Sequence, residues 1–175
     1  METKASLDTL SKVVTVGIIA LFAAISIGGF FCANGNSTII LISTGVLLFV
    51  TSITMGCYLF SPQGYVLNPD DLIIKRPLKD RSIKLSDIIE THAVVDTEMK
   101  YTLRTFGVGG LFGYYGKFYN PKFGSMTWYT TQRKNRIFIR TNKEEKIIIT
   151  PDDISLLSRI QEELKKQAIM KSGPA

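Results

Sequence analysis

The amino-acid sequence predicts an α+β protein in which a two-helix transmembrane hairpin precedes a β-rich domain that ends in an α-helix. Three features of the 175 residues predict this order. Two long apolar runs occupy residues 13–60, and no charged residue or histidine lies between Lys12 and Asp70. Short segments of strand-like residues follow, separated by polar turns, as in a sandwich or barrel. Beyond Pro151 the apolar spacing changes to a helical period.

The two apolar runs cover residues 13–33 and 38–60. Each is long enough for an α-helix to cross a hydrocarbon core of about 30 Å, which takes about 20 residues. Buried core helices are the disfavoured alternative, because a soluble chain of this size could not bury two such runs. Asn34–Ser37 suits a tight turn between two antiparallel transmembrane helices. Glycines that could allow a close approach of the two backbones are Gly28, Gly29, Gly45 and Gly56.

Charge predicts the orientation of the hairpin. The turn between the runs has no charge, whereas Lys4 and Lys12 precede the first run and the chain beyond Phe60 is rich in Lys and Arg. Positive flanks prefer the cytoplasm, so we expect both termini inside, with residues 1–12 as a cytoplasmic flank. Cleavage of the first run as a signal peptide is the alternative, but that run is longer than the usual length of about 7–15 residues. Even then the second run would leave the C-terminal domain inside.

Residues 64–168 form the expected soluble domain, and residues 169–175 a flexible tail. Seven segments have the residue pattern of strands: Tyr65–Leu67, Leu72–Lys75, Arg81–Leu85, Ile88–Val95, Met126–Thr131, Arg136–Thr141 and Lys146–Thr150. Thr150–Asp153 predicts the start of a helix, with Thr150 as its N-cap. The apolar stripe of this helix consists of Ile154, Leu157, Ile160 and Leu164. We expect the helix to cover the sheet.

The net charge of +6 belongs to the soluble domain, because Lys4 and Lys12 cancel Glu2 and Asp8. A basic domain beside an anionic leaflet gains about 1 kcal/mol for each well-placed Lys or Arg, which favours lipid binding. A basic cytoplasmic domain is also an ordinary consequence of membrane topology. Both interpretations of the charge therefore stand.

No residue pattern indicates catalysis or a bound cofactor. Cys32 and Cys57 both lie in the apolar runs, near opposite membrane faces, so we expect no disulfide. His92 is the only histidine, and without a cluster of His or Cys we expect no metal site. We also expect no catalytic residue, no cofactor and no nucleic-acid partner, since a turn-rich basic face explains the remaining cations.

The segment from Arg104 to Asn120 is rich in glycine and aromatic residues, and we call it the aromatic–glycine segment. Its glycine spacing misses the dinucleotide pattern, and no Ser or Thr follows Gly116-Lys117 as in a P-loop. In one interpretation the glycines permit tight or positive-φ turns, and the rings fold over an open barrel end. In the other, the rings and cations lie at the lipid headgroups or bind a protein partner. The candidate interaction residues are Arg104, Phe106, Phe112, Tyr114, Tyr115, Lys117 and Phe118.

Together with Ile148–Asp153, the aromatic–glycine segment resembles the bacterial PH-domain (pleckstrin-homology-like) membrane proteins of unknown function, in which one or two membrane helices precede a single PH-like module. The resemblance covers about residues 65–166. It implies a seven-stranded, partly open β-barrel with a C-terminal capping α-helix, a place in the bacterial cytoplasmic (inner) membrane, and no established catalytic activity. Eukaryotic relatives that bind phosphoinositides use basic residues in the first strand loop, whereas the loop here, Asn68–Asp71, is acidic.

The residues and the resemblance together predict a non-enzymatic, membrane-anchored interaction module. Its expected partner is the membrane itself, through anionic lipid headgroups, or another membrane protein. The alternative is an accessory or regulatory subunit of a membrane enzyme or transporter, docked through the aromatic–glycine segment.

Overall fold

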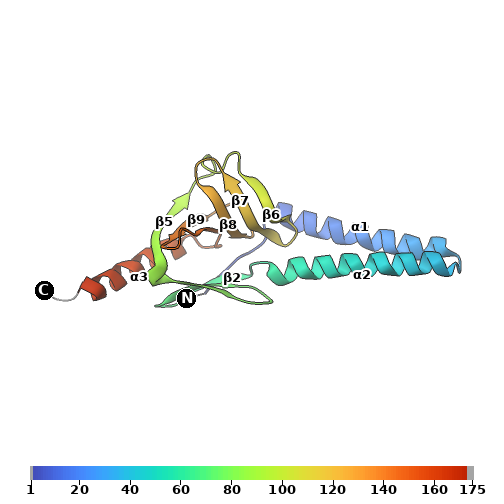
Figure 1. Cartoon of the computed structure of the whole chain (residues 1–175), viewed down its shortest axis with the longest axis horizontal. Helices are drawn as coiled ribbons and strands as arrows, with labels where there is room; N and C mark the ends of the chain where they lie inside the picture. The colour runs from blue at the N-terminus through green and yellow to red at the C-terminus, as the bar shows by residue number, and fades with distance from the viewer. Residues whose placement is uncertain (1, 173–175) are drawn as a thin grey trace.

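The computed structural model describes residues 2–172 and is elongated (Figure 1). Two long helices, α1 (Thr9–Ala33) and α2 (Ser37–Phe60), run side by side away from a β-rich domain. Helix α3 (Ser155–Ser172) lies on the opposite side of that domain. This arrangement confirms the predicted α+β class and the predicted order of its parts.

Polar caps set the ends of both apolar helices. Asp8 is the N-cap of α1, where its carboxylate accepts a hydrogen bond from the Ser11 N–H at 2.7 Å. The side chain of Asn36 caps α2 in the same way. Between the helices, Asn34 and Gly35 have positive φ angles of 41° and 82°. The expected tight turn is therefore present.

Both helices are long and apolar enough to cross a membrane. In their most apolar windows only 11% and 6% of the residues are buried, which is unlike the core helix of a soluble protein. This much exposed apolar surface indicates membrane association. A Cβ added to Gly29 would lie 2.5 Å from Ser43 Oγ, so this glycine allows the helices to approach closely. Gly28, Gly45 and Gly56 have no atom within 4 Å of such a Cβ, and the packing does not require them.

The N-terminal flank is part of the domain. Strand β1 (Glu2–Lys4) pairs antiparallel with β2 (Gly64–Leu67), the first strand after α2. The Asp8 N–H then donates to Thr131 O at 3.1 Å, and α1 begins before residue 13, where the apolar run starts. Three polar residues carry no strand signal of their own; the backbone edge of β2 supplies the pairing. Both helices are consequently attached to the domain at the same end.

The domain contains two open sheets, joined by a single 3-10 turn at Leu85–Asp87. The remaining strands are β3 (Asp71–Lys75), β4 (Arg81–Lys84), β5 (Ile88–Val94), β6 (Leu103–Gly110), β7 (Gly113–Asn120), β8 (Gly124–Thr130), β9 (Arg136–Thr141) and β10 (Lys146–Ile149). One sheet has the order β1-β2-β3-β4, and the other has the order β5-β9-β10-β8-β7-β6. Among the strands of residues 2–172, only β8 and β10 pair in parallel. The sheets do not close, as expected for a partly open barrel.

All seven predicted strand segments are strands, and three more strands occur among the described residues. The additional strands are β1 and the β6–β7 hairpin, which is formed by the aromatic–glycine segment. Glycines interrupt the alternation that marks a strand, so this hairpin gave no clear strand pattern. The strand count therefore exceeds the seven that the resemblance implied.

The main hydrophobic core lies where the four-stranded sheet and α3 pack against the six-stranded sheet. Tyr65 of β2 is fully buried there, and its hydroxyl donates to Tyr129 O at 2.6 Å and accepts from the Thr150 N–H at 3.1 Å. Burial raises the pKa of Tyr65 above its ordinary value, so the hydroxyl stays protonated and remains a donor. The aliphatic part of this core includes Leu72, Ile74, Ile83, Leu85, Ile137, Ile139, Ile147 and Ile149.

Helix α3 covers this core, as predicted. Leu156 and Ile160 are fully buried, whereas Ile154, which we expected in the same stripe, is 41% exposed and lies before the helix begins. The helix continues through the first residues of the expected tail to Ser172. Residues 173–175 of that tail lie outside the described residues.

The start of α3 differs from the prediction because Thr150, the expected N-cap, forms its hydrogen bonds with Thr131 and with Tyr65 of β2. Thr150 is not the N-cap: its hydroxyl accepts from the Thr131 N–H at 3.1 Å, and its own N–H donates to Tyr65. Asp153 takes over the role at the helix start, where its carboxylate accepts from the Ser155 N–H at 2.9 Å. A residue that ends one element cannot also cap the next when its polar groups are already bonded.

Candidate functional site at the membrane-proximal hairpin

The β6–β7 hairpin is the edge of the six-stranded sheet that lies nearest to α1 and α2 (Figure 1). Its strands approach closely at Gly107 and Gly116, which face each other in the register. Their φ angles are 115° and 123°, and a Cβ on them would lie 2.3 Å from Tyr115 O and 2.4 Å from Phe106 O, respectively. Only glycine adopts such angles without strain. The positive-φ positions of the structural interpretation are therefore present.

The tip of the hairpin binds the first turns of α1. Ser11 Oγ donates to Gly110 O at 2.6 Å, and the Phe112 N–H donates to Thr15 Oγ1 at 3.0 Å. Ser11 and Thr15 are four residues apart and therefore lie on one face of the helix. Phe112 has a φ of 56° in the tight turn between the strands. The side chains of an apolar helix thus satisfy the backbone groups of this turn.

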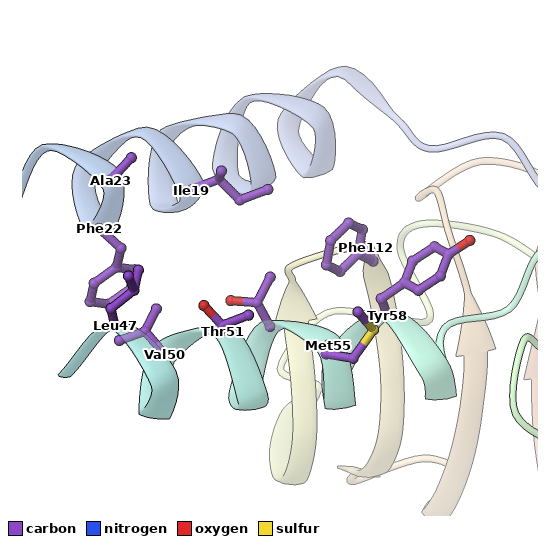
Figure 2. Close-up of a pocket in the computed structure, with 10 residues that line it drawn as sticks. Ile19, Phe22, Ala23, Leu47, Val50, Thr51, Met55, Tyr58 and Phe112 are labelled. Atoms are coloured by element: carbon purple, nitrogen blue, oxygen red, sulfur yellow. The ribbon is translucent and has the colours of Figure 1, made fainter. Parts of the chain in front are cut away.

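The hairpin also contacts the end of α2. The Tyr115 hydroxyl donates to Cys57 O, and the Phe112 ring meets the Tyr58 ring nearly edge-on, with 5.5 Å between centroids. Figure 2 shows Phe112 projecting between α1 and α2 beside Tyr58. Phe112 borders an apolar cavity of about 360 Å³ between the helices, which Ile19 of α1 also lines. The hairpin is therefore fastened to both helices.

Tyr114 contacts the cap of α1. Its hydroxyl lies 3.3 Å from each carboxylate oxygen of Asp8, to which it donates. The Arg133 guanidinium lies 5.3 Å from the centre of the Tyr114 ring. Burial, followed by the charge of Asp8, raises the pKa of Tyr114, so the hydroxyl stays protonated and remains a donor to the cap.

The seven candidate residues do not form one continuous surface. Phe112, Tyr114 and Tyr115 are turned toward the two helices, as described above. Phe118 belongs to a second buried cluster, where its ring stacks on Trp128 with 4.3 Å between centroids. Four of the seven residues thus contribute to the packing of the molecule.

The other three candidate residues, Arg104, Phe106 and Lys117, are exposed. Phe106 is 78% exposed and pairs with Lys117, whose Nζ donates to Thr127 Oγ1 at 2.8 Å. Arg104 pairs with Phe118, the neighbour of Lys117, so it lies on the opposite face of the hairpin. The functional interpretation therefore applies to a smaller set, with Phe106 and Lys117 on one face and Arg104 on the other.

Sequence reasoning missed the residues that hold the hairpin to α1. Asp8, Ser11 and Thr15 are polar residues at the start of an apolar helix, spaced three and four apart on one face. That spacing was an available signal for a buried polar contact. It does not name the partner, because Gly110 is distant in the sequence and meets α1 only in the folded chain.

Within residues 2–172, no three His, Cys, Asp or Glu side chains lie close enough to hold a metal ion. Cys32 and Cys57 are free thiols. His92 packs on Phe138 with ring centroids 5.0 Å apart, and its Nδ1 lies 3.4 Å from a carboxylate oxygen of Glu90. The groups gathered at the hairpin can act through ring packing, hydrogen bonds and positive charge.

Comparison with known proteins places the domain in a family. A family model described as a bacterial PH domain matches residues 63–167, which run from the end of α2 into α3 and include both sheets except β1. No curated protein and no solved structure matches the chain. The family match covers more than half of the 175 residues. The chain therefore belongs to the bacterial PH domain family.

Proposed function

We propose that this protein is a membrane-anchored interaction module whose domain binds the anionic lipid surface through the exposed side of the β6–β7 hairpin. In this proposal α1 and α2 cross the bacterial cytoplasmic membrane, both termini are cytoplasmic, and the domain has no catalytic role. Membership of the PH domain family supports an interaction module. The pairing of β1 with β2 supports placing both termini on one side of the membrane, because it keeps the N-terminal strand beside the domain at one end of the helix pair.

The observation that carries the proposal is the attachment of the hairpin to both helices. Bonds from Ser11 and Tyr115 fix the hairpin to α1 and α2. When the helices span a bilayer, their domain-side ends lie near the headgroups, and the hairpin is held there without any further binding step. Phe106 lines one cavity together with Phe60, the last residue of α2, so it lies at the domain-side end of that helix. An exposed apolar ring at this level gains by entering the boundary between headgroups and acyl chains.

Charge supports the same surface. The net charge of +6 arises beyond α2, because the four charged residues before it cancel. Two exposed cations, Arg104 and Lys117, lie on the two faces of the hairpin that carries Phe106. Each contributes about 1 kcal/mol beside an anionic leaflet, and salt weakens this contribution.

The test uses the full chain in lipid nanodiscs, because β1 and both helices are part of the folded domain. Trp128 is the only tryptophan, so Trp128→Phe leaves a background into which an indole can be placed. We expect the indole introduced by Phe106→Trp to be quenched by phosphatidylglycerol with brominated acyl chains. Ile89→Trp is the matched control, since Ile89 is 53% exposed on β5, the opposite edge of the same sheet.

The contribution of charge is tested in the same nanodiscs. Arg104→Gln and Lys117→Gln together should reduce quenching in phosphatidylglycerol and leave it unchanged in phosphatidylcholine, which has no net charge to attract them. Equal quenching at the two sheet edges, or none at Phe106→Trp, would contradict lipid binding by this surface.

A second candidate function, an accessory subunit of a membrane enzyme or transporter, is favoured by the edge of β6. This strand pairs only with β7 among the described residues, and Leu103 is 67% exposed on it. An unpaired edge can accept a strand from another protein. A photo-crosslinking residue at Leu103, compared with one at Ile89, separates the candidates: a discrete adduct with a membrane protein from Leu103 alone supports the subunit, and lipid adducts alone oppose it.

A further inference from the structure

A second apolar cavity lies between the end of α2 and the sheet face formed by the hairpin. Its volume is about 580 Å³, within the range of about 300–1,000 Å³ that is typical of small-molecule sites. Helix α2 contributes Gly56, Cys57 and Phe60, and β6 contributes Phe106 and Val108. The wall is therefore apolar, and part of it is a helix that is itself suited to a bilayer.

Arg76 is the one charged residue that lines this cavity. Its guanidinium lies 5.5 Å from the centre of the Tyr129 ring, which also lines the cavity. Asp80, the nearby carboxylate, pairs with Lys75 at 2.8 Å and accepts from the backbone N–H of Arg76. Arg76 Nε is buried and has no hydrogen-bond partner within residues 2–172. A guanidinium with an unused donor beside an apolar cavity can bind an acceptor, and an anion is the strongest one.

We infer that this cavity binds one anionic phospholipid from the surrounding leaflet, with an acyl chain against α2 and the hairpin and its phosphate on Arg76. The inference rests on the proposed function, because it needs α2 to lie in the bilayer. A free phosphate would leave the apolar wall uncovered, and a zwitterionic lipid such as phosphatidylcholine would bring its own cation close to the charge of Arg76. An anionic lipid supplies both the acyl chain and the negative charge. It can reach the cavity from the bilayer along α2.

The test is lipid retention by the full chain in detergent, measured by native mass spectrometry. The probes are dioleoyl phosphatidylglycerol and dioleoyl phosphatidylcholine. We expect one retained phosphatidylglycerol per chain, at a roughly tenfold preference over phosphatidylcholine. Arg76→Gln should abolish this preference. Lys79→Gln should keep it, because Lys79 is an exposed cation of the same turn and does not line the cavity.

Filling the cavity is an independent test. Gly56 lines the cavity, and a Cβ added there meets no atom within 4 Å, so Gly56→Leu introduces its bulk at the cavity wall without a backbone clash at Cβ. We expect this variant to retain about tenfold less phosphatidylglycerol. The matched control is Gly45→Leu, since Gly45 is equally unobstructed on the same helix and does not line this cavity. It should bind the lipid as the unmodified chain does.

Several outcomes would overturn the inference. They are equal retention of the two lipids by the unmodified chain, equal loss in Gly56→Leu and Gly45→Leu, and equal loss in Arg76→Gln and Lys79→Gln. Displacement of the lipid by millimolar glycerol 1-phosphate would also overturn it, because it would show a site for the headgroup alone.

This inference and the proposed function fail separately. Because Phe106 also lines the cavity, quenching is measured in the Arg76→Gln background, where it reports contact of the hairpin with acyl chains without the cavity lipid. Retention in detergent reports the cavity and does not require a bilayer surface. Lost lipid preference with intact quenching would remove only the lipid site, and retained preference without quenching would remove only surface binding by the hairpin.

Discussion

The two edge strands of the six-stranded sheet, β5 and β6, have different surroundings. Helix α3 packs against β5, where Gln161 Nε2 donates a hydrogen bond to Thr91 O at 3.3 Å. At β6 the tip is held, where Gly110 O accepts from Ser11 of α1. Further along the same strand Phe106 is 78% exposed.

This difference shows which edge of the six-stranded sheet is covered by other parts of the same chain. Sheet edges carry unpaired backbone groups, and proteins usually cover or blunt them. The β5 edge is completed by intramolecular packing, whereas the β6 edge lies beside the two apolar helices (Figure 1). The physical consequence is that changes near β5 should affect folding, and changes on the outer part of β6 should affect membrane or partner contacts.

The largest effect is expected from the cover of the β5 side. Ile160→Ala removes a fully buried side chain of α3 and should lower the free energy of unfolding by about 2–5 kcal/mol. Ile154→Ala, at a position that is 41% exposed, should change it by less than about 0.5 kcal/mol. Denaturant unfolding of the full chain in detergent, followed by the fluorescence of buried Trp128, measures both. Similar losses in the two variants would show that α3 does not complete this side.

A smaller effect is expected inside the hairpin. Gly107→Ala places a Cβ 2.3 Å from Tyr115 O at a φ of 115°. It should therefore lower the free energy of unfolding by about 1–3 kcal/mol. Gly45→Ala, which meets open space on α2, should be close to neutral in the same unfolding measurement. A neutral Gly107→Ala would mean that the strands of the hairpin do not approach as closely as described.

The smallest effect is expected where the hairpin meets α2. Tyr115→Phe removes the hydroxyl that donates to Cys57 O and should lower the unfolding free energy by about 0.5–1.5 kcal/mol. Tyr119→Phe is the control, because Tyr119 is 47% exposed on the same strand. Hydrogen exchange of the β6 amides in nanodiscs should rise in Tyr115→Phe and stay unchanged in Tyr119→Phe. Unchanged exchange in both variants would show that the hydrogen bond from Tyr115 to Cys57 O does not hold the hairpin to α2.

The sequence predicted most of the elements, but not how the seven candidate interaction residues are arranged. Alternation marked strands such as Arg136–Thr141, because one residue in two faces a core. The aromatic residues of the aromatic–glycine segment divide between buried and exposed positions. Phe118 packs inside, and Phe106 stays exposed. Aromatic residues occur in cores and in interfaces alike, so composition alone could not assign them.

The sequence by itself determined the two apolar helices, the seven strand segments and the covering helix, because each depends on a local pattern of apolar residues. Only the tertiary structure decided that residues 2–4 form an edge strand, that Thr150 ends a sheet instead of capping α3, and that Arg76 lines an apolar cavity beside α2. These features are contacts between segments that are far apart in the chain. Such contacts depend on which backbone edges and side chains come together in the folded chain, and the local spacing of apolar residues does not specify this.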